Sequence, residues 1–331
     1  MDEKAQDLYQ AYRSCAILKM VGAIMNNLIK LRKHNKLESF FDTGNSLAYT
    51  LLVPSLVVIF GVMLYPILYS FVISFSEVVF SNNTITFVGL KNYIEMFSDT
   101  YFLNSIGITV YFSIVTVAAE IVLGIGMAMV LNQEFRGRGF VRGIMILPWA
   151  LPSVVNAIMW KWIYDSNYGA LNAALSQLHL IDGYQLWLSD PASALNLMIY
   201  ANIWKETPYV VLLTIAALSN IPSELYESAR VDGANSWVAF WRITLPMIRP
   251  VVLILAITKT IWALQTFELV LILTGGGPAN GTQLITFFIH KNTFKFQDFG
   301  YGSAMAYFLT IITFVLSFIY IKFLSKDGEV I

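Results

Sequence analysis

The sequence has few charged residues, one cysteine and three histidines, and each shortage excludes a class of protein. Charged residues make up 13% of the 331 positions, whereas an ordinary soluble domain has roughly 25%. The single cysteine, Cys15, excludes a disulfide within the chain. The histidines, His34, His179 and His290, are scattered and form no HExxH pair, so we expect no catalytic metal site.

The sequence also lacks the motifs of an ATPase or a serine hydrolase. Gly275-Gly276-Gly277-Pro278 is a glycine-rich run, but no Lys-Ser or Lys-Thr follows it where a phosphate-binding loop requires one. No nucleophile elbow is visible. We therefore interpret the glycine run as a turn in an extracellular loop and predict that the chain is not itself an enzyme.

Apolar residues are abundant, at 57% of the chain, and they gather in long runs. A membrane helix needs roughly 20 such residues. Six runs reach or approach this length, which predicts an all-α, polytopic integral membrane protein. We place its spans at about 49–75, 103–131, 141–163, 194–219, 249–273 and 301–324. Pro148 and Pro152 interrupt the third span, and membrane helices tolerate such breaks around a cavity.

The distribution of Lys and Arg orients these spans. The outer loops hold only Lys91, Lys161, Lys291 and Lys295, whereas basic residues cluster in 1–48, 132–142, 220–250 and 322–331. Cytoplasmic segments carry this excess in membrane proteins. We therefore predict a multi-pass protein with both termini and the loop 220–250 in the cytoplasm.

Three parts follow from this topology: an extension at 1–48, a permease domain at 49–324 and a cytoplasmic tail at 325–331. The extension shows no cleavable signal peptide. Its apolar residues recur at helical spacing, which favours an amphipathic helix on the inner leaflet; the alternative is a poorly ordered tail. These residues are Ile17, Val21, Ile24, Leu28 and Leu31.

The loop 220–250 is polar and lies between two apolar runs. Glu224 and Glu227 suit the first turns of a helix, and Gly233 breaks that helix because glycine readily adopts positive φ. A second short amphipathic helix is predicted to follow and to end at Leu245-Pro246. A helix, an elbow and a second helix fixed to the membrane at both ends suggest a docking element.

The spacing of this loop resembles a known motif. Glu227-Ser228-Ala229, then Gly233, Ile243 and Leu245-Pro246 resembles the EAA loop of binding-protein-dependent ABC importer permeases, with Ser228 in place of the usual alanine. The segment 87–93 resembles a recurring segment of sugar-importer permeases, and 273–278 followed by 299–304 resembles the outer loop of maltose-type and glycerol-phosphate-type subunits. The end of the chain at 322–331 resembles the first permease of such a pair. The resemblance covers about 48–324.

The resemblance implies a prokaryotic membrane subunit that changes conformation and does no covalent chemistry. Its implied partners are a second homologous permease, two cytoplasmic ATPase subunits that bind ATP and Mg, an extracytoplasmic sugar-binding protein, the lipid bilayer and a carbohydrate, with no nucleic acid. Glu227 would face polar or basic groups of an ATPase, Ala229 would permit close approach and Gly233 would form the elbow. Trp237, Phe240 and Leu245-Pro246 would anchor the loop.

Polar residues inside spans are the candidates for the solute path, because such residues are costly unless they face a cavity or a partner. One group shares a face of the fourth span and another recurs along the fifth, with Glu268 expected one turn further. They are Asn202, Lys205, Glu206 and Tyr209, and then Lys259, Trp262, Gln265 and Glu268. Aromatic rings beside amides and carboxylates suit sugars. The alternative is that the charges are structural pairs, an interpretation that we favour for Glu120.

Other residues of the spans receive structural interpretations. Trp149, Trp160 and Trp162 are interpreted as an interfacial aromatic belt. Gly107, Gly124 and Gly126 are interpreted as close helix contacts.

Two rival functions remain at this stage. An ion-coupled carrier could use Glu120, Glu206 and Glu268, but the sequence shows no clear inverted repeat. A membrane scaffold could use the cytoplasmic loop and move no solute. The sequence leaves open the identity, length and charge of the sugar, whether the second permease is a copy of this chain, and the role of 1–48.

Overall fold

The computed structural model describes residues 44–79 and 84–325, which fall into two compact units that part between Tyr69 and Ser70. Each unit is described by itself. The expectations for 1–43 and for the tail 326–331 lie outside the described residues.

The described part of the first unit is a single apolar helical segment. It comprises α3 (Gly44–Val58), a π-helical turn (Ile59–Leu64) and the start of α4 (Tyr65–Ile73). Its side chains from Leu51 to Tyr69 are exposed, as a lipid-facing span requires. The π turn ends two residues before Pro66, whose ring would otherwise clash with the carbonyl group four residues back. The predicted first span is confirmed as far as Ile73.

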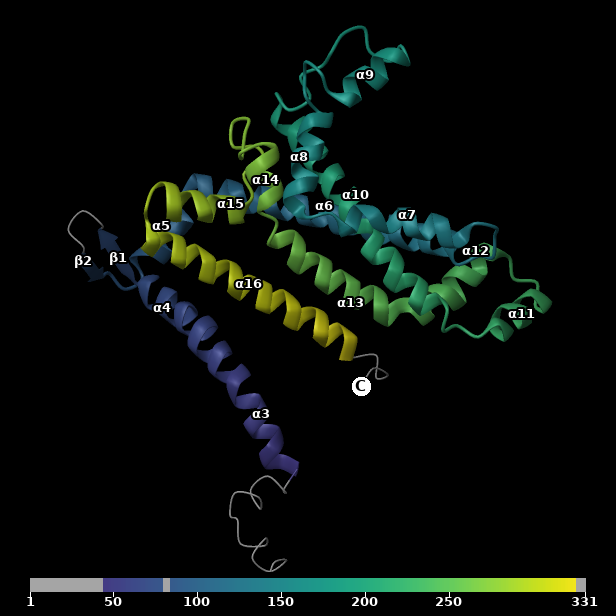
Figure 1. Ribbon diagram of the computed structural model, residues 1–331, viewed down its shortest axis with the longest axis horizontal. Helices are drawn as coiled ribbons and strands as arrows, with labels where there is room; N and C mark the ends of the chain where they lie inside the picture. The colour runs from purple at the N-terminus through teal and green to yellow at the C-terminus, as the bar shows by residue number, and fades with distance from the viewer. Residues whose placement is uncertain (1–43, 80–83, 326–331) are drawn as a thin grey trace, which may run out of the picture. The chain divides into compact units, whose positions relative to one another are not determined.

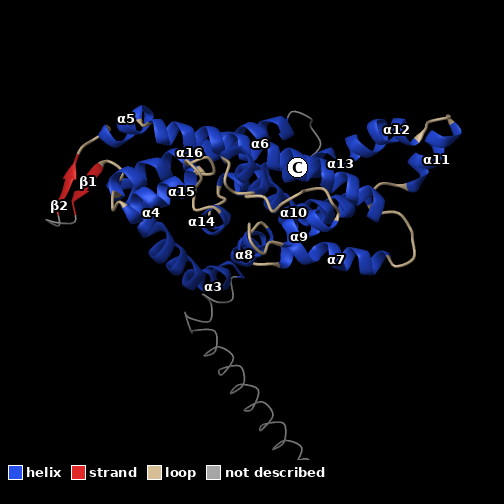
Figure 2. Cartoon of the chain, turned by 90° about the horizontal axis from the view of Figure 1, so that it is seen from above, coloured by secondary structure: helices blue, strands red, loops and turns tan. Residues whose placement is uncertain are grey.

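The second unit is built of long helices with a small hairpin at one end. The hairpin pairs β1 (Ser76–Val79) antiparallel with β2 (Thr84–Phe87), Ser76 opposite Phe87. Figure 1 shows α5 and α15 near the hairpin and α11 at the other end of the unit, and Figure 2 shows the same order from above. The helices are α5 (Lys91–Ser98), α6 (Thr100–Leu131), α7 (Arg138–Ala150), α8 (Ser153–Ile163), α9 (Ala170–Gln177), α10 (Pro191–Leu218), α11 (Ser223–Val231), α12 (Ser236–Ala239), α13 (Leu245–Leu264), α14 (Glu268–Leu273), α15 (Ile285–His290) and α16 (Phe299–Ser325).

Helices α6 and α10 pack along each other and form the centre of the unit together with α13. Their long apolar runs begin at acidic caps: Asp99 accepts the Tyr101 N–H at 2.8 Å, and Asp190 accepts the Ser193 N–H at 2.9 Å. At Gly124 the two helices meet so closely that a Cβ atom would collide with Val210.

The glycine prediction is therefore confirmed for Gly124 alone. A Cβ atom added at Gly107 or Gly126 would have no neighbouring atom within 4 Å in the described part of the chain, so the prediction is wrong for both of them.

The predicted third span is not one continuous helix. Helices α7 and α8 meet at a bend of 96°. Pro152 causes the break, because proline disfavours the helical region for the residue before it, and Leu151 is extended at φ −75° and ψ 135°. Pro148 is accommodated inside α7.

The fifth span also differs from its prediction. A continuous helical segment runs from Ser236 to Leu264, through a π-helical turn (Phe240–Thr244), so Leu245-Pro246 does not end the second helix of the loop. As in the first unit, the π turn precedes a proline and relieves the clash of its ring. At its other end the span stops at Leu264, and 268–273 form the separate helix α14.

The short connection between α13 and α14 is stabilised by a hydrogen bond from a residue distant in sequence. The Thr286 hydroxyl donates to the Thr266 carbonyl, one of the groups freed by the break. Neither proline nor glycine marks this break, so the apolar run alone predicted an unbroken span.

Among the described residues, four helical segments are long and apolar enough to cross a membrane, and the number rises to six if each of two bent pairs is one span. The bent pairs are α7 with α8, and α10 with α11, which meet at 73°. The fold is thus the predicted all-α, polytopic one. The predicted fourth span corresponds to α10 alone, with α11 in the polar loop.

Buried asparagines hold the non-helical segments of the second unit. Asn172 on α9 donates to the Gln185 carbonyl at 3.0 Å and accepts from the Trp187 indole at 2.9 Å. Asn92 on α5 donates to the carbonyls of Ser74 and Ser76 at 2.9 and 3.0 Å. These amides replace the backbone bonds that regular structure would supply.

Candidate functional site

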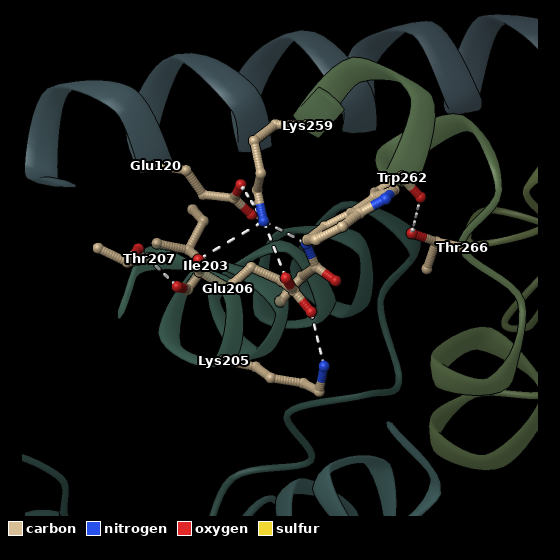
Figure 3. A network of polar contacts seen from close by, with 9 residues as sticks. Glu120, Ile203, Lys205, Glu206, Thr207, Lys259, Trp262 and Thr266 are labelled. Atoms are coloured by element: carbon tan, nitrogen blue, oxygen red, sulfur yellow. Dashed lines mark hydrogen bonds and ion pairs between the residues drawn. The ribbon is translucent and has the colours of Figure 1, made fainter. Parts of the chain in front are cut away.

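Four ionisable side chains from three helices form one buried network (Figure 3). Lys259 on α13 lies 3.1 Å from Glu120 Oε2 on α6 and 2.8 Å from Glu206 Oε2 on α10. Glu206 Oε1 lies 2.6 Å from Lys205 Nζ. The Lys259 and Glu120 side chains are only 2% and 1% exposed. Two buried carboxylates therefore share one ammonium group, which ties α6, α10 and α13 together.

Asn202 completes the network. Its Nδ2 donates to Glu120 Oε1 at 3.1 Å, one turn of α10 before Glu206. Both carboxylates of the network thus have hydrogen-bond donors, as buried charges require.

This network forms one wall of a cavity of about 230 Å³. The other walls come from the start of α8, the end of α13 and the start of α14, so the break between α7 and α8 and the break between α13 and α14 both lie at the cavity. The polar residues that line it are Glu120, Ser153, Asn156, Asn202, Lys205, Glu206, Lys259, Gln265, Thr266 and Glu268.

Aromatic rings border the cavity at Lys259. Its Nζ lies 4.9 Å from the ring centroid of Trp262 and 5.7 Å from that of Tyr209, within the range of cation–π attraction. Tyr209 in turn contacts Trp262 at 4.9 Å and Trp149 at 5.8 Å. Trp262 also lines the cavity and offers it an apolar ring.

The structure brings the predicted path residues together. Asn202, Lys205, Glu206, Lys259, Trp262, Gln265 and Glu268 line the cavity, and Tyr209 packs against Trp262. Glu268 was predicted to lie one helical turn beyond Gln265. This prediction is wrong, because the helix ends before Gln265 and Glu268 begins the separate helix α14. Whether these residues contact a solute stays a prediction.

Four polar lining residues were not predicted as part of the solute path: Glu120, Ser153, Asn156 and Thr266. Glu120 was set aside because nothing polar shares its helix face; its partners come instead from α10 and α13. Ser153 and Asn156 lie just after the break at Pro152. An asparagine within an apolar run is itself a signal, because an unpaired amide is costly in a membrane, and that signal could have identified Asn156.

The aromatic-belt interpretation is wrong for Trp160. Its side chain is buried and packs against Tyr164 at 5.2 Å and Trp204 at 5.6 Å. Trp162 is 65% exposed, as a belt residue would be. Trp149 is partly exposed and contacts Tyr209 beside the cavity.

The polar loop has the predicted elbow. Helix α11 ends at Val231, and Gly233 adopts φ +81°, a conformation that favours glycine. Asn235 then caps α12 by accepting the Val238 N–H at 2.9 Å. Glu227 and Ser228 are exposed on α11, where a partner could reach them.

One side-chain hydrogen bond joins α11 to the membrane helix. The hydroxyls of Tyr226 and Thr244 lie 2.9 Å apart, and Thr244 is buried in the π turn that leads into α13. Ala229 is half-buried and lines a hollow of about 330 Å³ between the loop and the ends of α6 and α10.

The expected anchors of the loop behave differently from one another. Phe240 and Leu245 pack against the apolar cluster that contains Ile248. Trp237 is 68% exposed, so its expected role as an anchor in the membrane core is wrong. Ile243 is half-buried and Pro246 is exposed.

The glycine run does form a turn. Gly275 and Gly276 both adopt positive φ, at 62° and 83°. Thr282 closes the turn by donating to the Gly277 carbonyl at 2.7 Å.

Comparisons with known proteins place this geometry in context. Residues 120–325 match the family model described as the binding-protein-dependent transport system inner membrane component. The chain is 37% identical over 276 residues to the trehalose/maltose transport system permease protein MalF of Thermococcus litoralis, covering 83% of this chain and 92% of that protein. It is 32% identical over 293 residues to the sulfoquinovosyl glycerol transport system permease protein SmoG of Agrobacterium fabrum, covering 87% and 94%.

A solved structure shares the fold. It is the bacterial alginate ABC transporter in complex with alginate pentasaccharide-bound periplasmic protein, with a TM-score of 0.74 and 23% identity over 86% of this chain and 95% of that chain. At this identity the likeness concerns the fold alone.

Proposed function

This chain belongs to the family of binding-protein-dependent transport system inner membrane components, and from that premise we propose that it conducts a sugar or oligosaccharide through the cavity beside Lys259. It is the permease subunit of a carbohydrate ABC importer. The solute is moved by alternating access, with ATP hydrolysed by partner subunits.

One observation carries the proposal: the polar loop 220–250 and the cavity lie at opposite ends of one continuous helical segment. The helical segment Ser236–Leu264 begins at the elbow of the loop and carries Lys259 and Trp262 at its other end. Thr244 and Lys259 are separated by about 22 Å along this helix at 1.5 Å per residue. A displacement of α11 is thereby delivered to the cavity wall.

The proposed partners follow from this role. Two cytoplasmic ATPase subunits, which bind ATP and Mg, receive the exposed face of α11 that carries Glu227 and Ser228. A second homologous permease completes the solute path, and an extracytoplasmic sugar-binding protein delivers the solute. Both termini of this chain lie in the cytoplasm, and the chain itself has no ATPase site.

Two measurements test the proposal. The importer reconstituted in liposomes should accumulate a labelled sugar only with ATP on the side of the ATPase subunits. Accumulation abolished by an uncoupler and indifferent to ATP would instead support an ion-coupled carrier, and ATP hydrolysis without accumulation would support a scaffold.

The second measurement addresses the loop. Cysteines placed at Glu227 or Gly233 should cross-link to an ATPase subunit in membrane vesicles, whereas a cysteine at the exposed outer-side residue Tyr168 should not. A loop that reacted only with reagents outside the cell would contradict the proposed orientation.

A further inference from the structure

The cavity holds its charges and hydrogen-bonding groups in an arrangement that selects among sugars. We propose that it admits uncharged, hydroxyl-rich sugars and rejects sugar acids such as uronates and sulfonates. This inference rests on the proposed function and concerns the same cavity.

The charges that this chain contributes to the cavity leave no free cation for an acidic solute. Glu120, Glu206 and Glu268 face Lys205 and Lys259, which gives a net charge of minus one when all are ionised. Both ammonium groups are already paired with carboxylates at 2.6 to 3.1 Å. Protonation of any one carboxylate would bring the net charge only to zero.

Glu268 places its charge where a solute would meet it. It is exposed on the cavity wall at the start of α14, and it makes no ion pair with the described residues. An anion entering the cavity would therefore meet a carboxylate whose charge no lysine of the described residues neutralises, and the two negative charges would repel each other.

Helix ends do not reverse this balance. Ser153 opens α8 at the cavity, and a helix amino terminus is equivalent to about half a positive charge. That is smaller than the full negative charge of Glu268. The amino end of α14 carries Glu268 itself, so the carboxylate of Glu268 already compensates the positive end of that helix dipole.

The hydrogen-bonding groups point to the same class of solute. Asn156 is 2% exposed, and its Oδ1 finds no donor among the described residues. Asn156 Oδ1 and the Glu268 carboxylate are both acceptors that a sugar hydroxyl can satisfy, because a hydroxyl donates; an ionised uronate or sulfonate group only accepts. Trp262 supplies a ring for the C–H face of the sugar.

The experiment uses matched pairs of neutral and acidic sugars. The probes are maltose, trehalose and cellobiose against cellobiouronic acid, digalacturonate and a sulfonated glucoside. Binding is measured by equilibrium dialysis to the purified assembly of permeases and ATPase subunits without the binding protein, and ATP-driven uptake is measured with the complete importer in liposomes. We expect a neutral sugar to bind and enter at least about tenfold better than every acidic probe, as repulsion by one charge would give.

Two variants locate the preference in the cavity. Glu268→Lys changes the charge of the cavity wall by two units and should raise the ratio of acidic to neutral binding by more than about tenfold, and Asn156→Ala should weaken neutral binding severalfold without raising that ratio. Glu134→Lys makes the same charge change on the exposed loop after α6 and should leave the ratio at its parental value.

Each outcome decides something. Stronger binding or faster uptake of an acidic probe by the parent, or an unchanged ratio in Glu268→Lys, would overturn the inference while leaving a sugar importer in place. If no sugar is accumulated while ATP is hydrolysed, the proposed function fails, and this inference fails with it.

Discussion

Gly124 lies where α6 packs directly against α10. A Cβ atom there would overlap the side chain of Val210, whereas Gly126, two residues further on the same helix, faces open space. The two glycines therefore differ in structural role although they are close in sequence. At Gly124 the missing side chain allows helix packing, and at Gly126 it only lowers helix propensity.

Substitution of the two glycines by alanine should separate these roles. Gly124→Ala forces the helices apart and should destabilise the permease by about 1–3 kcal/mol. Gly126→Ala is the matched control and should be neutral or stabilising by up to about 1 kcal/mol. Thermal unfolding in detergent measures both. Restoration of stability in Gly124→Ala combined with Val210→Ala would confirm the contact, and equal stability of the two single variants would contradict it.

Lys259 supports a second prediction at the residue scale. Lys259→Gln leaves Glu120 and Glu206 buried without their shared cation, which should destabilise the fold by about 3–5 kcal/mol. Lys205→Gln is milder, because Glu206 keeps Lys259 at 2.8 Å. Combining Lys259→Gln with Glu120→Gln removes one charge of each sign and should recover part of the loss. The yield of folded protein and its unfolding temperature report these effects.

If Lys259→Gln proved as stable as the parent, the network would not be a buried ion pair in the membrane-embedded protein. Full additivity in the double variant would likewise contradict coupling between Glu120 and Lys259, because residues in contact depart from additivity.

At the scale of elements, the joint between α11 and α13 is built from two hydroxyls and a π turn. Tyr226 approaches Thr244 at 2.9 Å, and Thr244 lies in the π turn Phe240–Thr244. Such turns often occur at functional sites. A force on α11 therefore reaches the membrane helix through the short loop at Gly233 and through this hydrogen bond.

Tyr226→Phe should loosen the joint and raise the number of ATP molecules hydrolysed per sugar imported about twofold or more, since one hydrogen bond contributes about 1 kcal/mol. Thr244→Val should have the same effect, and the double variant should be no worse than either single one. Tyr320→Phe is the matched control, because it removes a hydroxyl 3.4 Å from Thr260 on the same helix but far from the loop. An unchanged stoichiometry in Tyr226→Phe would show that the loop alone transmits the motion.

The elements also show what could be predicted from the sequence. Apolar runs predicted which parts of the chain form its long helices, and the rule for residues before proline accounts for the break at Leu151. The break after Leu264 could not be predicted, because a hydroxyl from Thr286 stabilises it and no local residue marks it. The continuation of the helix through Pro246 was missed because a π turn removes the usual clash.

The residues of the candidate site likewise separate into those that the sequence could predict and those that it could not. Helical spacing identified Asn202, Lys205 and Glu206, which share a face of one helix. The structural role favoured for Glu120 agrees with its buried ion pair to Lys259, but its partners could not be predicted, because they come from two other helices at a distance in sequence that periodicity does not reach. Spacing within a helix could be predicted, and contacts between helices could not.

At the scale of the whole molecule, the proposed site of energy input and the cavity lie in different regions, joined by the segment Ser236–Leu264. The ATPase partner is proposed to act on α11, and the solute on the walls beside Lys259. A lesion at the elbow should therefore affect the relation between the two activities rather than either one alone. Gly233 is the residue at which to test this.

Gly233→Asp introduces a side chain at φ +81° and a negative charge beside α11, at a conformational cost of about 1 kcal/mol. We expect the importer to assemble and hydrolyse ATP while sugar uptake falls at least about tenfold. A tenfold loss corresponds to about 1.4 kcal/mol, which is close to the conformational cost of the substitution. Gly137→Asp is the matched control: Gly137 also has positive φ, at 86°, and lies in another loop predicted to be cytoplasmic. Uptake and ATP hydrolysis are measured together in liposomes. If Gly233→Asp transported normally, or if Gly137→Asp uncoupled equally, the elbow would not be the part of the chain that converts motion of the loop into motion at the cavity.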